Sequence, residues 1–255
     1  MLDKPRVIAV CGKGGVGKTS ISAMIVREML KQPENKVLAV DADPAVGLAP
    51  ALGVFAGRTV DDIRNDLIRR VESGQAAGKA EMLAMLDYEM FSALEEKKNL
   101  AFLAIGRPEK EGCYCQVNHI LKEIIGSMAE NFDYVVIDGE AGIEQVNRRV
   151  MENVTHLVLV SDSSARGLNV VKTILSVSEN AISYDHAGLI LNRVRQASEL
   201  DSIQVPAAAT LAGWIPEDDV IRMADTSGDN LLDIAECAAT RAVHACLKNL
   251  MKNVK

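Results

Sequence analysis

Short apolar runs alternate along the chain with longer segments in which apolar residues recur every three or four positions. The first run, at 6–11, reads R-V-I-A-V-C, and a helical pattern follows it at 19–31. Continuous apolar runs are typical of strands that are covered on both faces of a sheet. Strands that alternate with helices predict a doubly wound, mainly parallel α/β sheet flanked by helices. The other strands are expected at 36–41, 100–105, 134–138, 156–161, 188–192 and 209–215.

One segment departs from this rhythm. Residues 60–95 are helical in pattern and rich in charge, and G-Q-A-A-G at 74–78 predicts a turn between two helices. We expect this segment to be a helical insertion over one edge of the sheet. A final helix is expected at 230–253. A chain of 255 residues fits one large domain more easily than two small ones, so a single domain over 1–255 is expected.

Composition narrows the range of partners. The formal net charge is −7, from 28 basic and 35 acidic residues, and no basic block interrupts this balance. Nucleic acid is therefore disfavoured as the main partner, as is broad attraction to an anionic membrane. No apolar run approaches the ~20 residues of a membrane helix, and the N-terminus lacks the apolar core of a signal peptide. We expect a cytoplasmic protein without stable membrane association, whose five cysteines are reduced thiols or metal ligands.

A phosphate-binding loop follows the first predicted strand. The segment 12–19 reads G-K-G-G-V-G-K-T, which matches the pattern G-x-x-x-x-G-K-[ST] between a strand and a helix. The glycines let backbone N–H groups turn around phosphate oxygens, and the helix N-terminus adds partial positive charge. Lys18 is expected to reach the β- and γ-phosphates of ATP, and the Thr19 hydroxyl to ligate Mg²⁺. The residues expected to bind ATP or ADP here are Gly12, Lys13, Gly14, Gly15, Val16, Gly17, Lys18, Thr19 and Ser20.

Two carboxylates follow the second predicted strand. The segment 36–44 reads K-V-L-A-V-D-A-D-P, which puts Asp41 and Asp43 at the end of a buried strand beside the phosphate loop. Carboxylates in this place can hold the waters of Mg²⁺ or orient the water that attacks the γ-phosphate. The alternative is that they cap the helix that follows, and for Asp41 the two interpretations fit equally well.

A third carboxylate ends the strand that precedes a glycine-rich turn. The segment 134–142 reads Y-V-V-I-D-G-E-A-G, in which four apolar residues lead to Asp138. Asp138 is expected in the Mg²⁺ shell. Gly142 can swing its backbone toward the γ-phosphate, because glycine tolerates the required change in φ and ψ. Glu140 could lie near the phosphate or face a partner subunit.

The segment 106–115 carries a possible metal site. It reads G-R-P-E-K-E-G-C-Y-C and precedes a predicted helix at 116–129, so Cys113 and Cys115 lie near a helix N-terminus that favours thiolate. Thiolates bind Zn²⁺, Ni²⁺ or Cu⁺. Two ligands are too few for a tetrahedral site, but a twofold dimer would bring four sulfurs together. A structural cysteine pair is the alternative. His119 could be a further ligand or a surface or interface histidine.

The phosphate loop, with its additional lysine, is similar to the deviant loop of the MinD/ParA/nitrogenase-iron-protein class of ATPases. This resemblance implies that Lys13 crosses a dimer interface and touches the partner's nucleotide, although a solvated lysine is the alternative. It implies that Asp43 activates the attacking water and contributes to the Mg²⁺ shell. Asn192 of I-L-N-R would read the adenine edge beside Arg193, and Pro216 of G-W-I-P-E would lie against the base. The alternatives are a plain strand-ending turn at Asn192 and a proline at the first position of a helix for Pro216.

Over nearly its whole length the chain resembles one family in particular, the CooC-type nickel-insertion ATPases of carbon monoxide dehydrogenase and acetyl-CoA synthase maturation. The resemblance lies in the deviant loop, D-A-D-P, G-R-x-E-x-x-G-C-Y-C and D-G-E-A-G-x-E-x-x-x-R-R. It implies a homodimeric ATPase that binds Ni²⁺ or Zn²⁺ at Cys113 and Cys115 and delivers nickel to a metalloenzyme client. The pair Asp138-Gly139 departs from the Asp-Asn of many members, which bears on the identity of the client.

Two other functions remain open from the sequence. A MinD/ParA-type positioning or partition ATPase would act as a scaffold on membrane or DNA, and the basic C-terminal K-N-L-M-K-N-V-K gives that function some support. This stretch has few large apolar residues and no aromatic residue. A nitrogenase-like electron carrier would need two well-separated cysteines per chain for its cluster, whereas the obvious pair here is adjacent.

The position of Lys13 predicts that Lys13→Gln binds ATP but does not dimerise with it. The phosphate contacts of Lys18 are retained in this variant, whereas the cation that would reach the partner's nucleotide is lost. Light scattering with saturating ATP should give a dimer for the wild-type chain and a monomer for the variant. Equal dimerisation of both proteins would refute a role for Lys13 across the interface.

Overall fold

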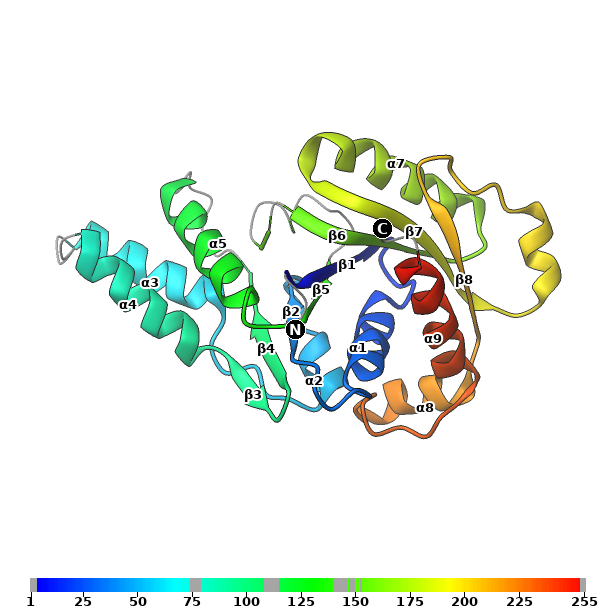
Figure 1. Cartoon of the computed structure of the whole chain (residues 1–255), viewed down its shortest axis with the longest axis horizontal. Helices are drawn as coiled ribbons and strands as arrows, with labels where there is room; N and C mark the ends of the chain where they lie inside the picture. Colours follow the sequence, from blue (N-terminus) through cyan, green and yellow to red (C-terminus); the bar gives the residue numbers. More distant parts are fainter. Residues whose placement is uncertain are drawn as a thin grey trace.

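The computed structural model of the chain describes residues 4–73, 79–107, 115–139, 146, 150–151 and 153–252 (Figure 1). A central sheet is flanked by helices. The strands are β1 Arg6–Gly12, β2 Val37–Asp41, β3 Glu95–Lys97, β4 Leu100–Ala104, β5 Tyr134–Asp138, β6 Asn153–Ser161, β7 Ser183–Val194 and β8 Thr210–Pro216. The helices are α1 Lys18–Met29, α2 Leu48–Leu52, α3 Val60–Glu72, α4 Lys79–Ser92, α5 Cys115–Ala129, α7 Ala165–Ala181, the 3₁₀ helix η1 Ala197–Ser202, α8 Asp219–Ser227 and α9 Ala238–Met251.

The described strands form one eight-stranded sheet in the order β3-β4-β2-β5-β1-β6-β7-β8. Every neighbouring pair is parallel except β3 with β4. Asp41 lies opposite Asp138 in the register of β2 and β5, and Val10 of β1 lies opposite Asp138 on the other side. The predicted phosphate-binding loop and the predicted carboxylates therefore lie together at the carboxyl-terminal ends of the parallel strands. The doubly wound, mainly parallel α/β fold predicted from the sequence is confirmed.

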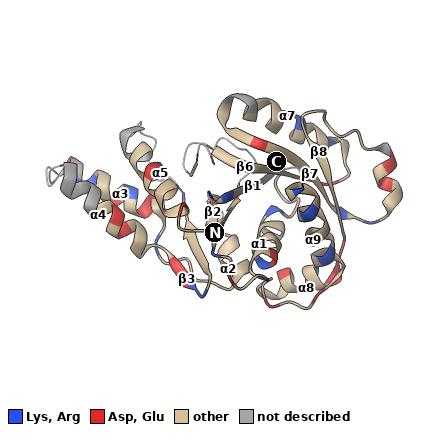
Figure 2. Cartoon of the chain, viewed as in Figure 1, with Lys and Arg blue, Asp and Glu red and all other residues tan. Residues whose placement is uncertain are grey.

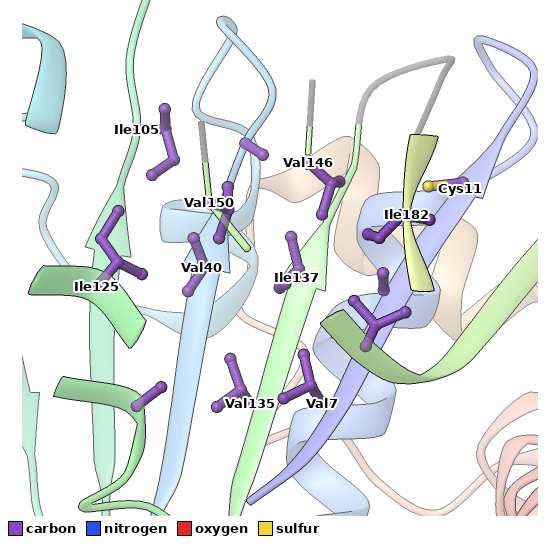
Figure 3. Packing of buried hydrophobic residues seen from close by; sticks show 14 of the residues in the cluster. Val7, Cys11, Val40, Ile105, Ile125, Val135, Ile137, Val146, Val150 and Ile182 are labelled. Carbon is purple, nitrogen blue, oxygen red and sulfur yellow. The ribbon is translucent and has the colours of Figure 1, made fainter. Parts of the chain in front are cut away.

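Apolar side chains cover both faces of the sheet. On one face, Val7, Val40 and Ile137 project toward a layer that includes Ile125 of α5, and this packing also takes in Cys11 at the end of β1 (Figure 3). On the other face, the strands pack against α1, α2 and α9. The strands carry few charged side chains, which lie mostly on helices and loops (Figure 2). Burial on both faces explains why these strands appear in the sequence as continuous apolar runs.

The helical insertion forms the expected pair of helices, α3 and α4, with the predicted turn at 74–78 outside the described residues. Both helices lie beside α5, toward the β3–β4 end of the sheet (Figure 1). Ile63 of α3 and Leu86 and Met90 of α4 are buried in the same apolar cluster as Ile125 of α5. The insertion thus extends one helical layer beyond the edge strands.

Strand β3 was not predicted. It contains three residues, Glu95 to Lys97, and pairs antiparallel with β4 through a turn in which Lys98 has a φ of +56°. A strand this short and polar leaves no apolar pattern to detect. Its charges suit an outer position, because charged side chains protect a sheet edge from pairing with other chains.

The predicted start of the last helix at residue 230 was wrong, since α9 begins at Ala238. The Asn230 side chain accepts hydrogen bonds from the backbone N–H groups of Leu232 and Asp233, both at 3.1 Å. Such a side-chain turn offers these N–H groups an alternative to helical bonds. Cys237 is the N-cap residue of the helix, and its N–H donates to the Thr240 hydroxyl at 2.9 Å.

Helix α9 packs close to the sheet because two strands present glycine to it. A Cβ atom on Gly188 of β7 would lie 2.0 Å from Leu250 Cδ2, and one on Gly213 of β8 would lie 2.7 Å from Cys246 Sγ. Leu250 and Cys246 are 3% and 2% exposed, so neither side chain has room to withdraw. The apolar face of α9 is therefore committed to the core.

This close approach predicts a coupling between Gly188 and Leu250. Gly188→Ala should cost about 1–3 kcal/mol by overpacking, and Leu250→Ala about 2–5 kcal/mol by leaving a cavity. The double variant should lose at least ~0.5 kcal/mol less than the sum, because each change relieves the other. Urea unfolding of the four proteins measures this difference. Additive losses would show that the two residues do not meet.

Candidate functional site

The phosphate loop lies between the carboxyl end of β1 and the first turn of α1. Gly17 occupies the residue before α1 with a φ of +89°, a backbone conformation that favours glycine. At the start of the loop, a Cβ on Gly12 would lie 2.1 Å from the Val160 carbonyl oxygen of β6. Glycine is therefore required at both ends of the loop, and the backbone N–H groups of such a loop can surround an anion.

The lysine predicted to bind phosphate turns back across its own loop. Lys18 is 8% exposed, and its Nζ lies 3.4 Å from the Lys13 carbonyl oxygen, to which it donates. The ammonium group is thus held at the loop that would receive the phosphates. Lys13 itself is half-buried, and among the described residues its side chain has no hydrogen-bond or ion-pair partner.

Asp138 lies beside this loop with one carboxylate oxygen satisfied and the other free. Ser22 Oγ donates to Asp138 Oδ1 at 3.0 Å, whereas the buried Oδ2 has no hydrogen-bond partner among the described residues. Burial raises the pKa of Asp138 to about 6, although hydrogen bonds from Thr19 and Ser22 and the charge of Lys18 lower it. A buried carboxylate oxygen without a donor fits a cation. Thr19 and Asp138 could therefore hold Mg²⁺ together.

Asp41 has a different environment. Its Oδ1 accepts from the Asp43 N–H at 3.0 Å, and its Oδ2 accepts from the Leu48 N–H at 2.7 Å. Burial raises the pKa of Asp41 to about 7, against these two hydrogen bonds. Of its two interpretations, the arrangement supports the structural one, because both oxygens hold the loop between β2 and α2.

Asp43 lies in this loop and is half-buried. Its Oδ1 accepts from the Ala45 N–H at 2.9 Å, and its charge contributes to the raised pKa values of Asp41 and Asp138. Asp43 is thus within electrostatic range of the other two carboxyl groups. The loop is also strained, because Val46 has a φ of +51° that a β-branched side chain rarely adopts.

A cavity of about 270 Å³ opens beside the phosphate loop, between the ends of β7 and β8 and the starts of α1, α8 and α9. It brings together Asn192, Arg193 and Pro216, the three residues expected at the base. Asn192 Nδ2 donates to the Val16 carbonyl oxygen at 2.8 Å, and Arg193 Nη1 donates to the Gly15 carbonyl oxygen at 3.1 Å. Both side chains therefore tie the loop to the cavity wall. An amide retains a second N–H and an oxygen, which is what an adenine edge requires.

The sequence did not reveal several residues that line this cavity. Asp218 closes it at the α8 end, where its Oδ1 accepts from the Val220 N–H at 2.9 Å and its Oδ2 from the Ala239 N–H at 3.0 Å. One carboxylate thus caps two helices. The signal was present in P-E-D-D, an acidic helix start after a strand. The other lining residues that were missed are Met24, Ile215, Glu217, Ile221, Arg222, Asp225 and Ala239.

Part of the candidate metal site lies outside the described residues. Cys113 is not described, whereas Cys115 is the first residue of α5. Gly142, which was predicted to approach the γ-phosphate, and Glu140 also lie outside the described residues. His119 is exposed, and its Nε2 lies 3.4 Å from Glu123 Oε1 on the same helix. Among the residues that the structure describes, no group of three or more His, Cys, Asp or Glu side chains could hold a metal ion.

Three other cysteines are free, buried thiols: Cys11, Cys237 and Cys246. Burial raises the pKa of Cys11 to about 12, so this thiol is protonated and poorly reactive. Gly139 also lies close to this thiol. A Cβ on Gly139 would lie 2.8 Å from the Val10 carbonyl oxygen and 2.9 Å from Cys11 Sγ. A residue larger than glycine after Asp138 would therefore require the backbone at the end of β1 to shift.

Comparison with known proteins gives a consistent family likeness. The family model of an AAA domain matches residues 5–187. An uncharacterized ATP-binding protein of Methanocaldococcus jannaschii is 36% identical over 90% of this chain and 92% of that protein. The carbon monoxide dehydrogenase accessory protein CooC of Rhodospirillum rubrum is 29% identical over 97% of each chain. The septum site-determining protein MinD of Pyrococcus horikoshii, complexed with Mg-ADP, shares the fold, with a TM-score of 0.65, 24% identity and coverage of 97% and 96%.

The orphaned oxygen of Asp138 predicts that Asp138→Asn stabilises the nucleotide-free chain. In the wild type the pKa rises from 3.8 to about 6 on folding, so above pH 6 the folded state carries a charge that burial disfavours. Removing that charge should raise the unfolding free energy by roughly 1–3 kcal/mol at pH 8. The gain should shrink as the pH falls through about 6 and vanish near 3.8, because the wild-type carboxyl group then becomes protonated.

Urea unfolding at pH 8 and pH 5 measures this stability difference, and calorimetry with ATP measures the effect of Mg²⁺. The variant should lose the Mg²⁺-dependent part of ATP affinity while it gains stability. Asp87→Asn, on an exposed position of α4, is the matched control and should change neither. A variant that is less stable at pH 8, or that keeps the full Mg²⁺ effect, would contradict this assignment.

Proposed function

This chain belongs to the AAA domain family as a MinD-like P-loop ATPase, and from that premise we propose that it is an ATP-dependent metallochaperone. Two subunits would bind Ni²⁺ or Zn²⁺ through Cys113 and Cys115 at a cytoplasmic dimer interface. The cargo would be nickel, and the client a metalloenzyme of the carbon monoxide dehydrogenase or acetyl-CoA synthase type. Nucleic acid and membrane have no part in this proposal.

The observation that carries the proposal is the place where the chain segment that precedes Cys115 leaves the sheet. Ala104 ends β4 directly opposite Asp41 in β2, so the connection that leads to Cys115 starts beside the Asp41–Asp43 loop. A change in the Asp41–Asp43 loop on ATP binding or hydrolysis would therefore occur next to the start of the connection that leads to Cys115. The end of β4 thus lies on the same side of the sheet as the candidate nucleotide site.

Charge and helix geometry support the metal assignment. Cys115 begins a helix of 15 residues, whose N-terminus favours a thiolate there. One chain supplies two sulfurs, and a twofold axis would supply four, the number that a tetrahedral site needs. The likeness to a carbon monoxide dehydrogenase accessory protein extends over 97% of each chain, which includes this segment.

The candidate site suits hydrolysis of ATP to ADP and phosphate. Lys18 and the loop N–H groups would hold the β- and γ-phosphates, while Asn192 and Pro216 hold the base. Mg²⁺ on Thr19 and Asp138 would neutralise phosphate charge, and a nucleotide complex with magnesium in a protein of this fold supports that cofactor. Asp43 would orient a water whose oxygen bonds to the γ-phosphorus as the bond to ADP breaks.

Coupling between ATP and cargo requires only a difference between two dimer arrangements. If Lys13 reaches the partner's nucleotide, ATP favours the closed arrangement by its difference in affinity for the two states. The four sulfurs meet only in the arrangement that the interface permits, so metal and nucleotide would influence each other's binding. Glu140 has two possible positions in this scheme, near the phosphate or toward the partner.

A MinD/ParA-type positioning ATPase is the second candidate, favoured by the shared fold. A scaffold on a membrane would need a free apolar surface on the basic C-terminal helix. The apolar face of α9 is instead buried at Val243, Leu247 and Leu250. Within the described part of the chain, no helix is long and apolar enough to cross a membrane.

The proposal predicts that purified wild-type chain binds one Ni²⁺ or Zn²⁺ per dimer at its cysteine site. Binding should release protons and weaken at low pH, because thiolate ligation requires deprotonation. Cys113→Ser with Cys115→Ser should lose the metal and metal-linked dimerisation together but retain ATP binding. Plasma emission on gel-filtered protein gives the stoichiometry, and calorimetry gives the nucleotide affinity.

His119→Gln is the matched control on the same helix, where His119 is already paired with Glu123. If this variant binds as many metal ions per dimer as the wild type, His119 is not a ligand and the site consists of the cysteines. A ratio near zero for wild type, or equal ratios in wild type and the double cysteine variant, would favour the positioning ATPase.

A further inference from the structure

Two histidines lie side by side at the end of the sheet opposite the candidate nucleotide site. His156 of β6 and His186 of β7 are direct partners in the parallel register, so their side chains share one face. Their ring centroids are 5.7 Å apart, and the ring planes are inclined by 40°. Ser161, five residues along β6, is roughly 16 Å away at the nucleotide edge.

Hydrogen bonds fix the tautomer of His156. The Thr155 hydroxyl donates its hydrogen to the Val7 carbonyl oxygen at 2.8 Å. The same Oγ1 lies 2.8 Å from His156 Nδ1 and must therefore accept from it. Nδ1 carries the hydrogen, and the lone pair of the neutral ring is on Nε2.

This lone pair is buried and unused. His156 is 1% exposed, and among the described residues its Nε2 has no hydrogen-bond partner. An unsatisfied buried acceptor destabilises the folded state, so such groups call for an explanation. The chain has four histidines, and two of them contrast with this one: His119 is paired with Glu123 and His244 with Glu28.

The surroundings keep the imidazole neutral. Burial lowers the pKa of His156 to about 4, helped by the charges of His186 and Arg6 and opposed by Asp185. A neutral ring that donates through one nitrogen and offers a lone pair on the other is the form that ligates metals. Metal–nitrogen bonds of about 2.0–2.1 Å put two imidazole centres on one ion roughly 5–6 Å apart. The neighbouring His186 is half-buried.

We propose that His156 and His186 form a second metal site, at the amino-terminal ends of β6 and β7, for a divalent transition cation such as Cu²⁺, Ni²⁺ or Zn²⁺. Imidazole nitrogen suits these ions. The two rings supply two ligands and water completes the shell, since no third His, Cys, Asp or Glu joins them among the described residues. The site is independent of the proposed cysteine site.

The test uses the full chain with Cys113→Ser and Cys115→Ser, so that the cysteines contribute nothing. Cu²⁺ is the first probe, because it binds nitrogen ligands most tightly in the first-row series. One Cu²⁺ per chain is expected, with an electron paramagnetic resonance spectrum of two equatorial nitrogens. Ni²⁺ and Zn²⁺ should displace it when in excess.

Three substitutions probe the geometry. His156→Gln and His186→Gln should each weaken Cu²⁺ binding at least tenfold by calorimetry. Thr155→Val should weaken it about 10- to 100-fold, because Thr155 only orients the ring. His186 is half-buried, so His186→Gln keeps the test valid if the buried substitution unfolds the chain. His119→Gln and His244→Gln are the matched controls and should leave the affinity unchanged.

A substitution of Arg6 tests whether the ion that binds at the two histidines is positively charged. The charge of Arg6 acts on His156, so Arg6→Gln should tighten a cation several-fold but weaken an anion. Unchanged Cu²⁺ affinity in His186→Gln and Thr155→Val, or a spectrum without two nitrogens, would overturn the proposal. So would weaker Cu²⁺ binding in Arg6→Gln. None of these results depends on whether the cysteines bind metal.

Discussion

Asp138 has to be negatively charged to hold a cation, and it lies where the folded chain opposes that charge. It ends a central strand between two others, with neighbours of the same sign in Asp41 and Asp43. This conflict accounts for much of the local structure. Ser22, Thr19 and Lys18 stabilise the charge of Asp138 in part, whereas Asp41 directs its own oxygens to backbone N–H groups.

The loop between β2 and α2 contains a second buried carboxylate, Asp41. Asp41 uses both oxygens on backbone N–H groups, which fixes the loop, and the loop accepts a strained Val46 as a result. Backbone strain persists only where the surroundings enforce it. The hydrogen bonds of Asp41 thus lie in the same loop as a residue whose backbone conformation is rare for a β-branched side chain.

The sequence predicted the parts of the fold that rest on repeated local signals. The β strands with continuous apolar runs and the phosphate loop could be recognised because burial and glycine requirements leave a clear pattern. β3 could not, since three charged residues carry no periodicity, and the start of α9 was missed because Asn230 diverts two N–H groups. In the cavity, the predicted Asn192, Arg193 and Pro216 come together, while Met24, Ile221 and Ala239 converge only through tertiary packing. The pairing of His156 with His186 likewise depends on strand register, which no local pattern reveals.

Asp218 links the N-termini of two helices, α8 and α9. Its carboxylate binds the first turns of both α8 and α9 at the wall of the cavity. Helix α9 contains 14 residues, a rod of about 21 Å, and its last residue, Met251, contacts Arg6 at the far end of the sheet. The glycines of β7 and β8 bring this helix close to the sheet. One continuous, closely packed helix therefore spans the distance between the wall of the cavity and the start of β1.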